Sequence, residues 1–468
     1  MIRVIQQAVR DRQRAPKQDV PVDLDGVTVP LRREAVLRAR DRARSTHRPH
    51  NVARKLFVTD VLNELARAEA RVLDRPFDDE DLPYARDRLW SEPGVYGALD
   101  ELWPLLTPER LLAGLLGSAQ AIRSAAGAVL DHAERARLTR SDHPSRWTVA
   151  DVPLLDEAAE LLGVDDSAQK AARRELERAQ RLEAKYAAEV LDITGVADLG
   201  MVDAETLAAW NRDNGPALST AERAEADRSW AYGHVIIDEA QELSAMAWRM
   251  VLRRNPARSM TVVGDVAQTG SPAGATSWKD MLTPLVGSRW REERLTVNYR
   301  TPSEIMTVAA DVLASVSPDE RPPESVRSEG VGPTAVHVSS SGLHSAGPDN
   351  GVATQARADL TELGGPDGGR LAIIAPDALI PALASAVPEA VPGSRPESLD
   401  SPAALLTVSE AKGLEFDRVI VADPAGILTQ SENGAHDLYV AITRATHRLA
   451  VIYDGDLPPS LLALYDSP

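Results

Sequence analysis

The chain has 468 residues, of which 43% are hydrophobic, which is enough for two or three domains with a sizeable core. It contains no cysteine, which excludes disulfides, thiol chemistry and cysteine-ligated zinc and is compatible with a cytoplasmic location. No run of about 18 apolar residues is present to cross a bilayer. Because the first residues include no apolar signal segment either, we expect neither a membrane protein nor an exported one.

The net charge of −18 bears on the kind of partner. Proteins that hold nucleic acid mainly through its phosphates usually carry a basic balance or a basic patch. The acidic total therefore favours a protein partner over nucleic acid, although it leaves room for a local basic groove.

Residues 1–51 are rich in arginine and include a hairpin signal. Six arginines lie between residues 31 and 44, where the apolar face is weak. We interpret this segment as a basic helix with solvated charges, and a nucleic-acid or phosphate-binding patch is the alternative. Asp25-Gly26 separates two short β-type segments, which predicts a two-residue hairpin turn.

Residues 52–230 are predicted to be almost entirely helical. Apolar residues recur at helical spacing, and residues 166–191 form a long charged segment. Thr107-Pro108 predicts a helix start, with threonine as the N-cap and proline at the first helical position. We interpret the tryptophans of this block as core residues rather than contacts. Among them are Trp90, Trp103, Trp147 and Trp210.

The first candidate site lies at the end of a short apolar run. Val235–Ile237 is followed directly by the carboxylates of Asp238 and Glu239. A buried parallel strand ends in this way at the edge of an α/β sheet where ligands bind. The aspartate can hold a hydrated magnesium and the glutamate can orient or deprotonate a water, which suits phosphoryl transfer. For the dipeptide alone, a solvated strand end is an equal alternative.

Two later segments fit the same chemistry. Thr261–Val263 is a second apolar strand that ends in Gly264-Asp265. The amide of Gln268, in the loop that follows, can sense a phosphate or an attacking water. Further on, Arg300 carries a guanidinium whose fork of donors suits a phosphate.

The remaining residues, 301–468, are predicted to form a second α/β domain. Thr301-Pro302 opens a helix that runs to Val316. Beyond it, short apolar strands alternate with helical segments, as in a parallel sheet. The predicted strands are Leu371–Ala375, Ala404–Val408, Val419–Ala422 and Leu449–Tyr453.

Five motifs in order resemble the superfamily 1 helicases of the UvrD/Rep type. One such motif is weak evidence, whereas five in the right order make a specific signal. The matching segments are Asp238-Glu239-Ala240-Gln241 (Walker B), Gly264-Asp265 to Gln268 (motif III), Asn298-Tyr299-Arg300 (motif IV), Ala411-Lys412-Gly413-Leu414-Glu415-Phe416 (motif V) and Tyr439–Ala445 (motif VI).

The resemblance implies an α/β fold with two RecA-like parallel-sheet domains, the first of them incomplete, and a large all-helical insertion. It assigns residues 1–51 to a remnant of the first domain, 52–230 to the insertion, 231–300 to the C-terminal part of the first domain and 301–468 to the second domain. The implied cofactors are ATP and Mg²⁺, with Asp238 as the metal ligand. The implied catalytic residues are Asp238, Glu239, Gln268, Arg300 and Arg444, and the implied nucleotide-binding residues are Gly264, Asp265, Lys412, Gly413 and Glu415. Taken alone, Arg444 would be interpreted as a structural salt-bridge residue.

The size of the helical block resembles that of HelD, the RNA-polymerase-associated helicase-like factor, and two departures from the general helicase pattern support this narrower assignment. The helical block of about 180 residues is larger than the usual insertion. About a hundred residues separate Arg300 from Ala411, which leaves no room for the accessory domain of the unwinding enzymes. The loop 269–274 also lacks the aromatics on which single-stranded bases stack, a contact of roughly 1–3 kcal/mol per base. This resemblance implies RNA polymerase as a partner and weak binding of DNA.

The family's phosphate-binding loop is missing from the sequence. None of the six lysines follows a glycine, so no Gly-x-x-x-x-Gly-Lys-Thr/Ser motif is present. Loss of two or three charge-assisted hydrogen bonds costs roughly 3–9 kcal/mol, or about two to six decades of nucleotide affinity. We expect a truncated protein that lacks ATPase activity alone, whose missing part is an N-terminal segment or a companion chain. The strands of Walker B and motif III should then present an unpaired apolar edge.

Three hypotheses remain open at this point. The first is an incomplete copy of an ATP-driven, HelD-like factor that remodels or recycles RNA polymerase. The second is a non-catalytic module that binds the polymerase without nucleotide turnover. The third is an ordinary DNA helicase, a translocase subunit, or the motor half of a recombination complex.

Overall fold

The computed structural model describes residues 1–140, 146–163, 219–275, 277–316, 322–347, 349–364 and 368–466. The chain divides into two compact units, Met1–Ala231 with Arg249–Arg254, and Tyr232–Trp248 with Asn255–Pro468. The charged helix predicted over residues 166–191, and Trp210, lie outside the described residues. Among the residues described, no helix has the length and apolar character needed to cross a bilayer.

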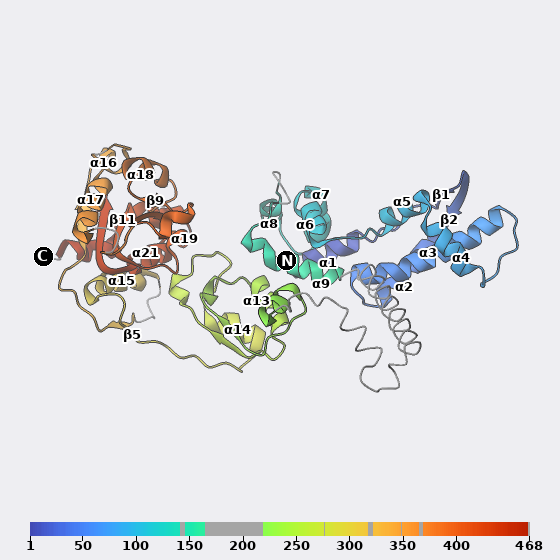
Figure 1. The fold of residues 1–468 in the computed structure, drawn as a ribbon, viewed down its shortest axis with the longest axis horizontal. Coiled ribbons are helices and arrows are strands. Elements are labelled where there is room, and N and C mark those ends of the chain that lie inside the picture. The colour runs from blue at the N-terminus through green and yellow to red at the C-terminus, as the bar shows by residue number, and fades with distance from the viewer. Residues whose placement is uncertain are drawn as a thin grey trace, which may run out of the picture. The chain divides into compact units, whose positions relative to one another are not determined.

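The described part of the first unit is helical apart from one hairpin and short turns (Figure 1). Thr107 caps its helix as predicted, because its hydroxyl accepts a hydrogen bond from the Arg110 amide, and Pro108 is the first helical residue. The elements described in this unit are α1 (Ile2–Asp11), β1 (Val20–Leu24), β2 (Val27–Leu31), α2 (Arg33–Ser45), α3 (His50–Val72), α4 (Leu82–Trp90), α5 (Pro93–Leu102), α6 (Pro108–Leu116), α7 (Ala119–Ala126), α8 (His132–Leu138), α9 (Val152–Leu162) and α12 (Thr220–Ala226).

Residues 1–51 are part of this helical unit. β1 and β2 pair antiparallel around Asp25-Gly26, and both turn residues have positive φ, as the predicted Asp-Gly turn requires. The apolar side of the hairpin is buried in one core with α2, α3 and α5. The apolar side chains of residues 1–51 therefore pack within the helical unit, and their assignment to a remnant of a RecA-like domain stays a prediction. The boundary at residue 51 also falls inside α3.

A buried polar cluster lies where α3 meets the segment after α5. The His50 ring is tilted against Trp103, with 5.4 Å between the ring centroids. Its Nε2 lies 2.8 Å from the carbonyl oxygen of Pro104, and its Nδ1 lies 3.3 Å from the amide nitrogen of Gln13. These partners suit a neutral ring that donates from Nε2 and accepts at Nδ1. The pKa of His50 is lowered to about 4, mainly by burial; the hydrogen bond to Pro104 acts in the opposite direction, and the nearby charge of Arg54 adds to the lowering.

The second unit contains a six-stranded, entirely parallel sheet in the order β7-β12-β11-β8-β10-β9. The four strands predicted from apolar runs are all present, which confirms the α/β class. The strands are β7 (Thr334–His337), β8 (Leu371–Ala375), β9 (Val391–Pro392), β10 (Ala403–Thr407), β11 (Phe416–Ala422) and β12 (Ala445–Tyr453). The helices around them are α15 (Ser303–Val316), α16 (Ser340–His344), α17 (Gly351–Leu363), α18 (Ile380–Ala386), α19 (Val408–Ala411), α20 (Pro424–Gln430) and α21 (Gly434–Thr443).

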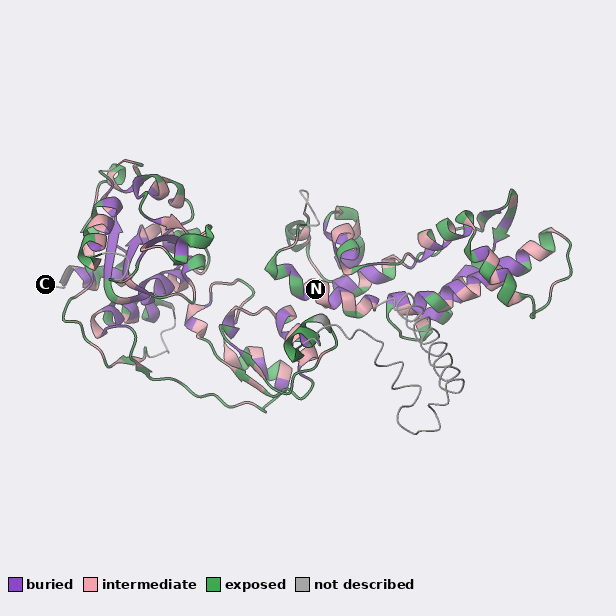
Figure 2. Ribbon diagram, in the orientation of Figure 1, coloured by how far each residue is buried: buried purple, intermediate pink, exposed green. Residues whose placement is uncertain are grey.

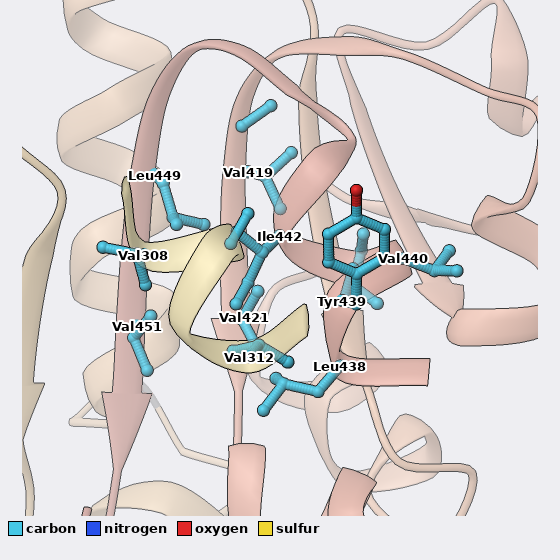
Figure 3. Close-up of a cluster of buried hydrophobic side chains, with 14 of the residues drawn as sticks. Val308, Val312, Val419, Val421, Leu438, Tyr439, Val440, Ile442, Leu449 and Val451 are labelled. Atoms are coloured by element: carbon cyan, nitrogen blue, oxygen red, sulfur yellow. The ribbon is translucent and has the colours of Figure 1, made fainter. Parts of the chain in front are cut away.

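Helices cover both faces of this sheet, which explains why its strands are continuous apolar runs (Figure 2). In β8, Ala372 and Ile374 face a core shared with α15 and α21. Figure 3 shows Val308 of α15 and Ile442 of α21 in this core. Leu371 and Ile373 of the same strand face the opposite core, shared with α17 and α18. Burial on both faces holds the carboxyl ends of β10 and β11, and the loops beyond them, in fixed positions.

The Walker B and motif III strands form a separate two-stranded parallel sheet in the same unit. β3 (Val235–Ile237) pairs with β4 (Met260–Val262), and α13 (Ala245–Arg254) connects them. α14 (Trp278–Val286) follows, and β5 (Val297–Asn298) pairs with β6 (Glu324–Ser325). Ile236 is 73% exposed and Val263 is 46% exposed, although parallel strands normally bury both faces. Within the described residues, this sheet therefore has an apolar surface that nothing covers.

The neutral state of His50 gives the first unit a pH-dependent stability. A pKa depressed from 6.5 to about 4 means that the unfolded chain binds the proton more readily, so stability is lost as pH falls from about 6.5 towards 4. We expect a loss of about 2 kcal/mol between pH 7 and pH 5 from this group. Urea unfolding of the full chain and of His50→Gln at both pH values isolates the contribution. Equal pH dependence in the two proteins would contradict it.

Candidate nucleotide site

The site begins at the end of β3, where two carboxylates follow the strand. Glu239 adopts a left-handed backbone conformation, with φ of 50°, which is uncommon for a residue with a side chain. The amide of Glu239 donates to Asp238 Oδ1 over 2.9 Å. The backbone turns at this point, and both residues are exposed at the end of β3.

Gln241 joins the Walker B segment to motif III. Its side chain is almost fully buried; its Nε2 donates to Glu239 Oε2 over 2.6 Å, and its Oε1 accepts from the Asp265 amide over 3.2 Å. Gly264 is required beside it, because a Cβ at that position would lie 2.2 Å from Gln241 Oε1 and 3.0 Å from the Trp278 ring. The role of Gly264 in this structure is thus close approach.

Gln268 connects motif III to motif VI. Asp265 caps the short turn that follows it, accepting from the Ala267 amide, and its other oxygen accepts from Gln268 Nε2 over 2.9 Å. The remaining polar atom of that amide, Gln268 Oε1, accepts from Arg444 Nη2 over 2.7 Å. Both polar atoms of the Gln268 amide are therefore hydrogen-bonded, Nε2 to Asp265 of motif III and Oε1 to Arg444 of motif VI.

Arg444 follows α21 and is 6% exposed. Its guanidinium also donates to the carbonyl oxygens of Val440 and Leu414, so backbone and side-chain acceptors satisfy most of its donors. Burial lowers the pKa of Arg444, and the nearby carboxylates of Glu239 and Glu415 act in the opposite direction. Arg444 is therefore no simple surface salt bridge; it is a buried cation held mainly by neutral acceptors.

Arg300 and the motif V loop lie near the same arginine. Arg300 Nη1 is 2.5 Å from Glu415 Oε1, and its positive charge contributes to the lowered pKa of Arg444. Gly413 has φ of +72°, and a Cβ there would lie 4.0 Å from Glu239 Oε1. The glycine permits the left-handed turn that brings motif V beside the Walker B glutamate.

Lys412 is engaged within the protein. Its Nζ lies 3.1 Å from Glu242 Oε1, and the same carboxylate accepts from the amides of Gly270 and Ser271. Gly270 is needed for this approach, because a Cβ there would fall 1.7 Å from Lys412 Nζ. The lysine predicted to bind nucleotide thus anchors the loop after motif III to motif V.

The structure brings most of the predicted residues together. Glu239, Gln268, Arg300, Arg444 and Glu415 are linked by hydrogen bonds, an ion pair or electrostatic proximity, as the contacts above specify. Asp238 adjoins the group through its bond to the Glu239 amide.

The carboxylates at the end of β3 can be compared with what a bound Mg²⁺ requires. No cluster of three or more His, Asp or Glu side chains able to hold a metal by themselves occurs in the described part of the chain. One exposed carboxylate with free oxygen lone pairs still fits Mg²⁺, which keeps several waters and takes its other ligands from phosphates. Asp238 would be the protein ligand in such a site.

Sequence reasoning missed Gln241 and Glu242 as site residues. Both lie in the Walker B segment, yet their partners are 24 to 170 positions away in the chain. The available signal was their place directly after Asp238-Glu239, where polar residues beside a predicted site are candidates to position it.

Comparison with known proteins supports a helicase relationship for one part of the chain. Residues 402–452, which span β10 to β12, match the UvrD-like helicase C-terminal domain. This segment contains the predicted motifs V and VI. No curated protein matches the sequence.

Among solved structures, similar chains are also helicases. The C-terminal domain of a possible DNA helicase from Lactobacillus plantarum WCFS1 is 23% identical, with a TM-score of 0.26, over 36% of this chain and 94% of that one. Arterivirus nonstructural protein 10, a helicase, is 15% identical in its complex with DNA and 17% identical in a second crystal structure, with TM-scores of 0.26 and 0.27. Each alignment covers 48% of this chain and 40% of the viral protein, so the chain spans less than half of that relative's length.

The close approach at Gly264 gives a direct test of how the two strands are joined. Gly264→Ala places a methyl group against Gln241 Oε1, so we expect a loss of about 1–3 kcal/mol in unfolding free energy. Gly233→Ala is the matched control, because a Cβ there meets nothing within 4 Å. Urea unfolding measures both, and equal stability of the two variants would refute the packing described.

Proposed function

We propose that this chain, whose residues 402–452 match the UvrD-like helicase C-terminal domain, is part of an ATP-dependent helicase-like factor of the HelD type that acts on RNA polymerase. The single observation that supports a nucleotide-responsive site best is the hydrogen bond between Gln268 and Arg444, formed beside the carboxylates of Glu239 and Glu415. These residues come from four of the five motifs and meet around one buried cation.

The residues of the site divide the work of phosphoryl transfer among them. Bound Mg–ATP would supply the phosphoanhydride and a hydrated cation. Asp238 would hold the cation, and Glu239, whose carboxylate accepts from Gln241, would position or deprotonate a water. Arg444 and Arg300 would offer guanidinium donors to negative charge on phosphate, and Gln268 is the acceptor that such a charge would replace on Arg444. Glu415, which pairs with Arg300 in this structure, would accept a ribose hydroxyl.

The chain supplies only part of this machinery. A glycine-rich loop with a lysine is absent from the sequence, and Lys412 is engaged with Glu242. We propose that an additional polypeptide segment or companion chain provides the loop and covers the exposed residues Ile236 and Val263. The isolated chain is then deficient in ATP hydrolysis.

We favour binding of RNA polymerase in the cytoplasm over DNA unwinding as the activity of this chain. The net charge of −18 is unfavourable for a protein that holds nucleic acid along its whole surface. The loop after motif III is tied to Glu242 by two backbone hydrogen bonds and carries no aromatic residue from Thr269 to Gly274. It therefore offers no platform on which bases could stack.

The first test is hydrolysis by the full chain. We expect the rate at saturating Mg–ATP to equal that of Glu239→Gln, because the phosphate-binding loop is missing. Colorimetric release of inorganic phosphate from both proteins measures it. A rate for the unmodified chain well above that of the variant would overturn the proposal of an incomplete site.

The second arm of the same test concerns the partner. Immobilised full chain should retain purified RNA polymerase with or without ATP, and an immobilised acidic protein of similar net charge is the control bait. Retention no greater than that control would exclude the HelD type. In that case, tight binding of single-stranded DNA with a steep salt dependence would favour the helicase alternative.

A further inference from the structure

The charge of the chain is unevenly distributed. Residues 1–50 contain twelve lysines and arginines and six aspartates and glutamates, a net charge of +6. The other 418 residues therefore carry a net charge of −24, which together with +6 gives the total of −18. A basic N-terminal segment in so acidic a protein calls for an account of where its cations lie.

The structure gathers these cations into two facing rows. On α2, Arg33, Arg40 and Arg44 lie within one stripe, because residues seven and four positions apart share a helix face. The stripe is about 16 Å long, given 1.5 Å of rise per residue. The other row consists of Arg10, Arg14 and Lys17 at the end of α1 and in the loop that follows. We call these six residues the basic seam.

Hydrogen bonds fix the two rows side by side. At one end, Arg44 donates to Gln13 Oε1 over 2.6 Å and to the carbonyl oxygen of Arg10 over 3.2 Å. At the other end, Arg33 Nε donates to the carbonyl oxygen of Pro16 over 3.1 Å. The loop with Arg14 and Lys17 therefore runs alongside α2, and the seam is a built feature of the fold.

The positive charge of the seam is poorly compensated. Arg10, Arg14, Lys17 and Arg33 are exposed, and within the described residues none of them forms an ion pair with a carboxylate. Two carboxylates offset part of the charge of the seam, since Asp41 pairs with Arg40 and Asp19 accepts from the Arg33 amide. Burial and the proximity of Arg40 and Arg10 lower the pKa of Arg44, and the carboxylate of Asp41 acts in the opposite direction.

We propose that the basic seam binds the phosphodiester backbone of a nucleic acid, independently of the nucleotide site in the second unit. Arginine predominates, and its guanidinium matches a phosphate with two parallel donors. A stripe of cations about 16 Å long on α2, with further cations in the loop beside it, suits a chain of regularly spaced phosphates. Such contacts position a strand without reading its bases.

The surroundings of the seam disfavour a protein or a membrane as its ligand. None of the large exposed apolar residues of the described chain lies before Val72. A protein interface needs an apolar centre, and a membrane-binding basic helix needs an exposed apolar face. Phosphate contacts need neither, because counterion release drives them.

The test neutralises the three seam cations whose side chains make no hydrogen bond or ion pair among the described residues. The variant is Arg10→Gln/Arg14→Gln/Lys17→Gln, in the full chain. The control, Arg38→Gln/Arg75→Gln/Arg137→Gln, removes the same charge from exposed arginines elsewhere in the unit that are equally without such bonds. Equal unfolding midpoints would establish that both variants are folded.

Fluorescence anisotropy with labelled single-stranded and duplex oligonucleotides, over a range of salt, gives the readout. With four exposed cations engaged, log K should fall with log salt at a slope of about −3 for single strands and about −4 for duplex. The seam variant should bind at least tenfold more weakly with a slope reduced by about 2, while the control keeps both values.

Three results would overturn the proposal. The first is no binding of either oligonucleotide by the unmodified chain. The second is equal loss of affinity in the seam variant and the control, which would reduce the effect to total charge. The third is displacement of the oligonucleotide by polyglutamate at matched charge concentration, which would make an acidic protein the better ligand. Because the seam is outside the second unit, none of these outcomes depends on ATP hydrolysis or polymerase binding.

Discussion

The hydrogen bond from Arg444 to Gln268 is the contact on which the nucleotide site depends. A guanidinium that is 6% exposed cannot be left without acceptors, since a buried charge without partners costs several kcal/mol. Backbone carbonyls and the Gln268 amide provide those acceptors in this structure. A phosphate with negative charge would be a stronger acceptor than a neutral amide. A phosphate could therefore replace Gln268 as the acceptor of Arg444. Gln268 also donates to Asp265, which lies in the loop that follows β4.

A second set of contacts explains how the segments of the site are held. Gln241 connects Glu239 to Asp265, and Glu242 connects Lys412 to the loop at Gly270 and Ser271. Gly264 and Gly270 lie beside these side chains, and a Cβ at either position would collide with Gln241 or Lys412. The β3–β4 sheet, by comparison, leaves apolar residues exposed on one face, although parallel strands are normally covered on both faces.

The sequence predicted the elements that depend on local pattern. Continuous apolar runs identified β8, β10, β11 and β12 because strands buried on both faces admit little else. Asp25-Gly26 identified the hairpin because a two-residue turn of this kind needs positive φ at both positions, which few residue pairs adopt. The motifs located most of the site, but the roles of Gln241 and Glu242 depend on contacts across many residues that no local pattern encodes. No local pattern in residues 1–51 predicted that their hairpin packs on α2, α3 and α5, because those contacts join residues far apart in the chain.

The central claim is that Arg444 and Gln268 form one unit that senses the terminal phosphate of a nucleotide. Its most direct test is the ratio of affinities for Mg–ATPγS and Mg–ADP, measured by NMR titration of the unmodified chain, Gln268→Ala, Arg444→Ala and the double variant. The account predicts that the unmodified chain prefers the triphosphate and that each single variant loses this preference about as fully as the double variant does, because the two residues are coupled. An identical ratio in all four proteins would contradict it.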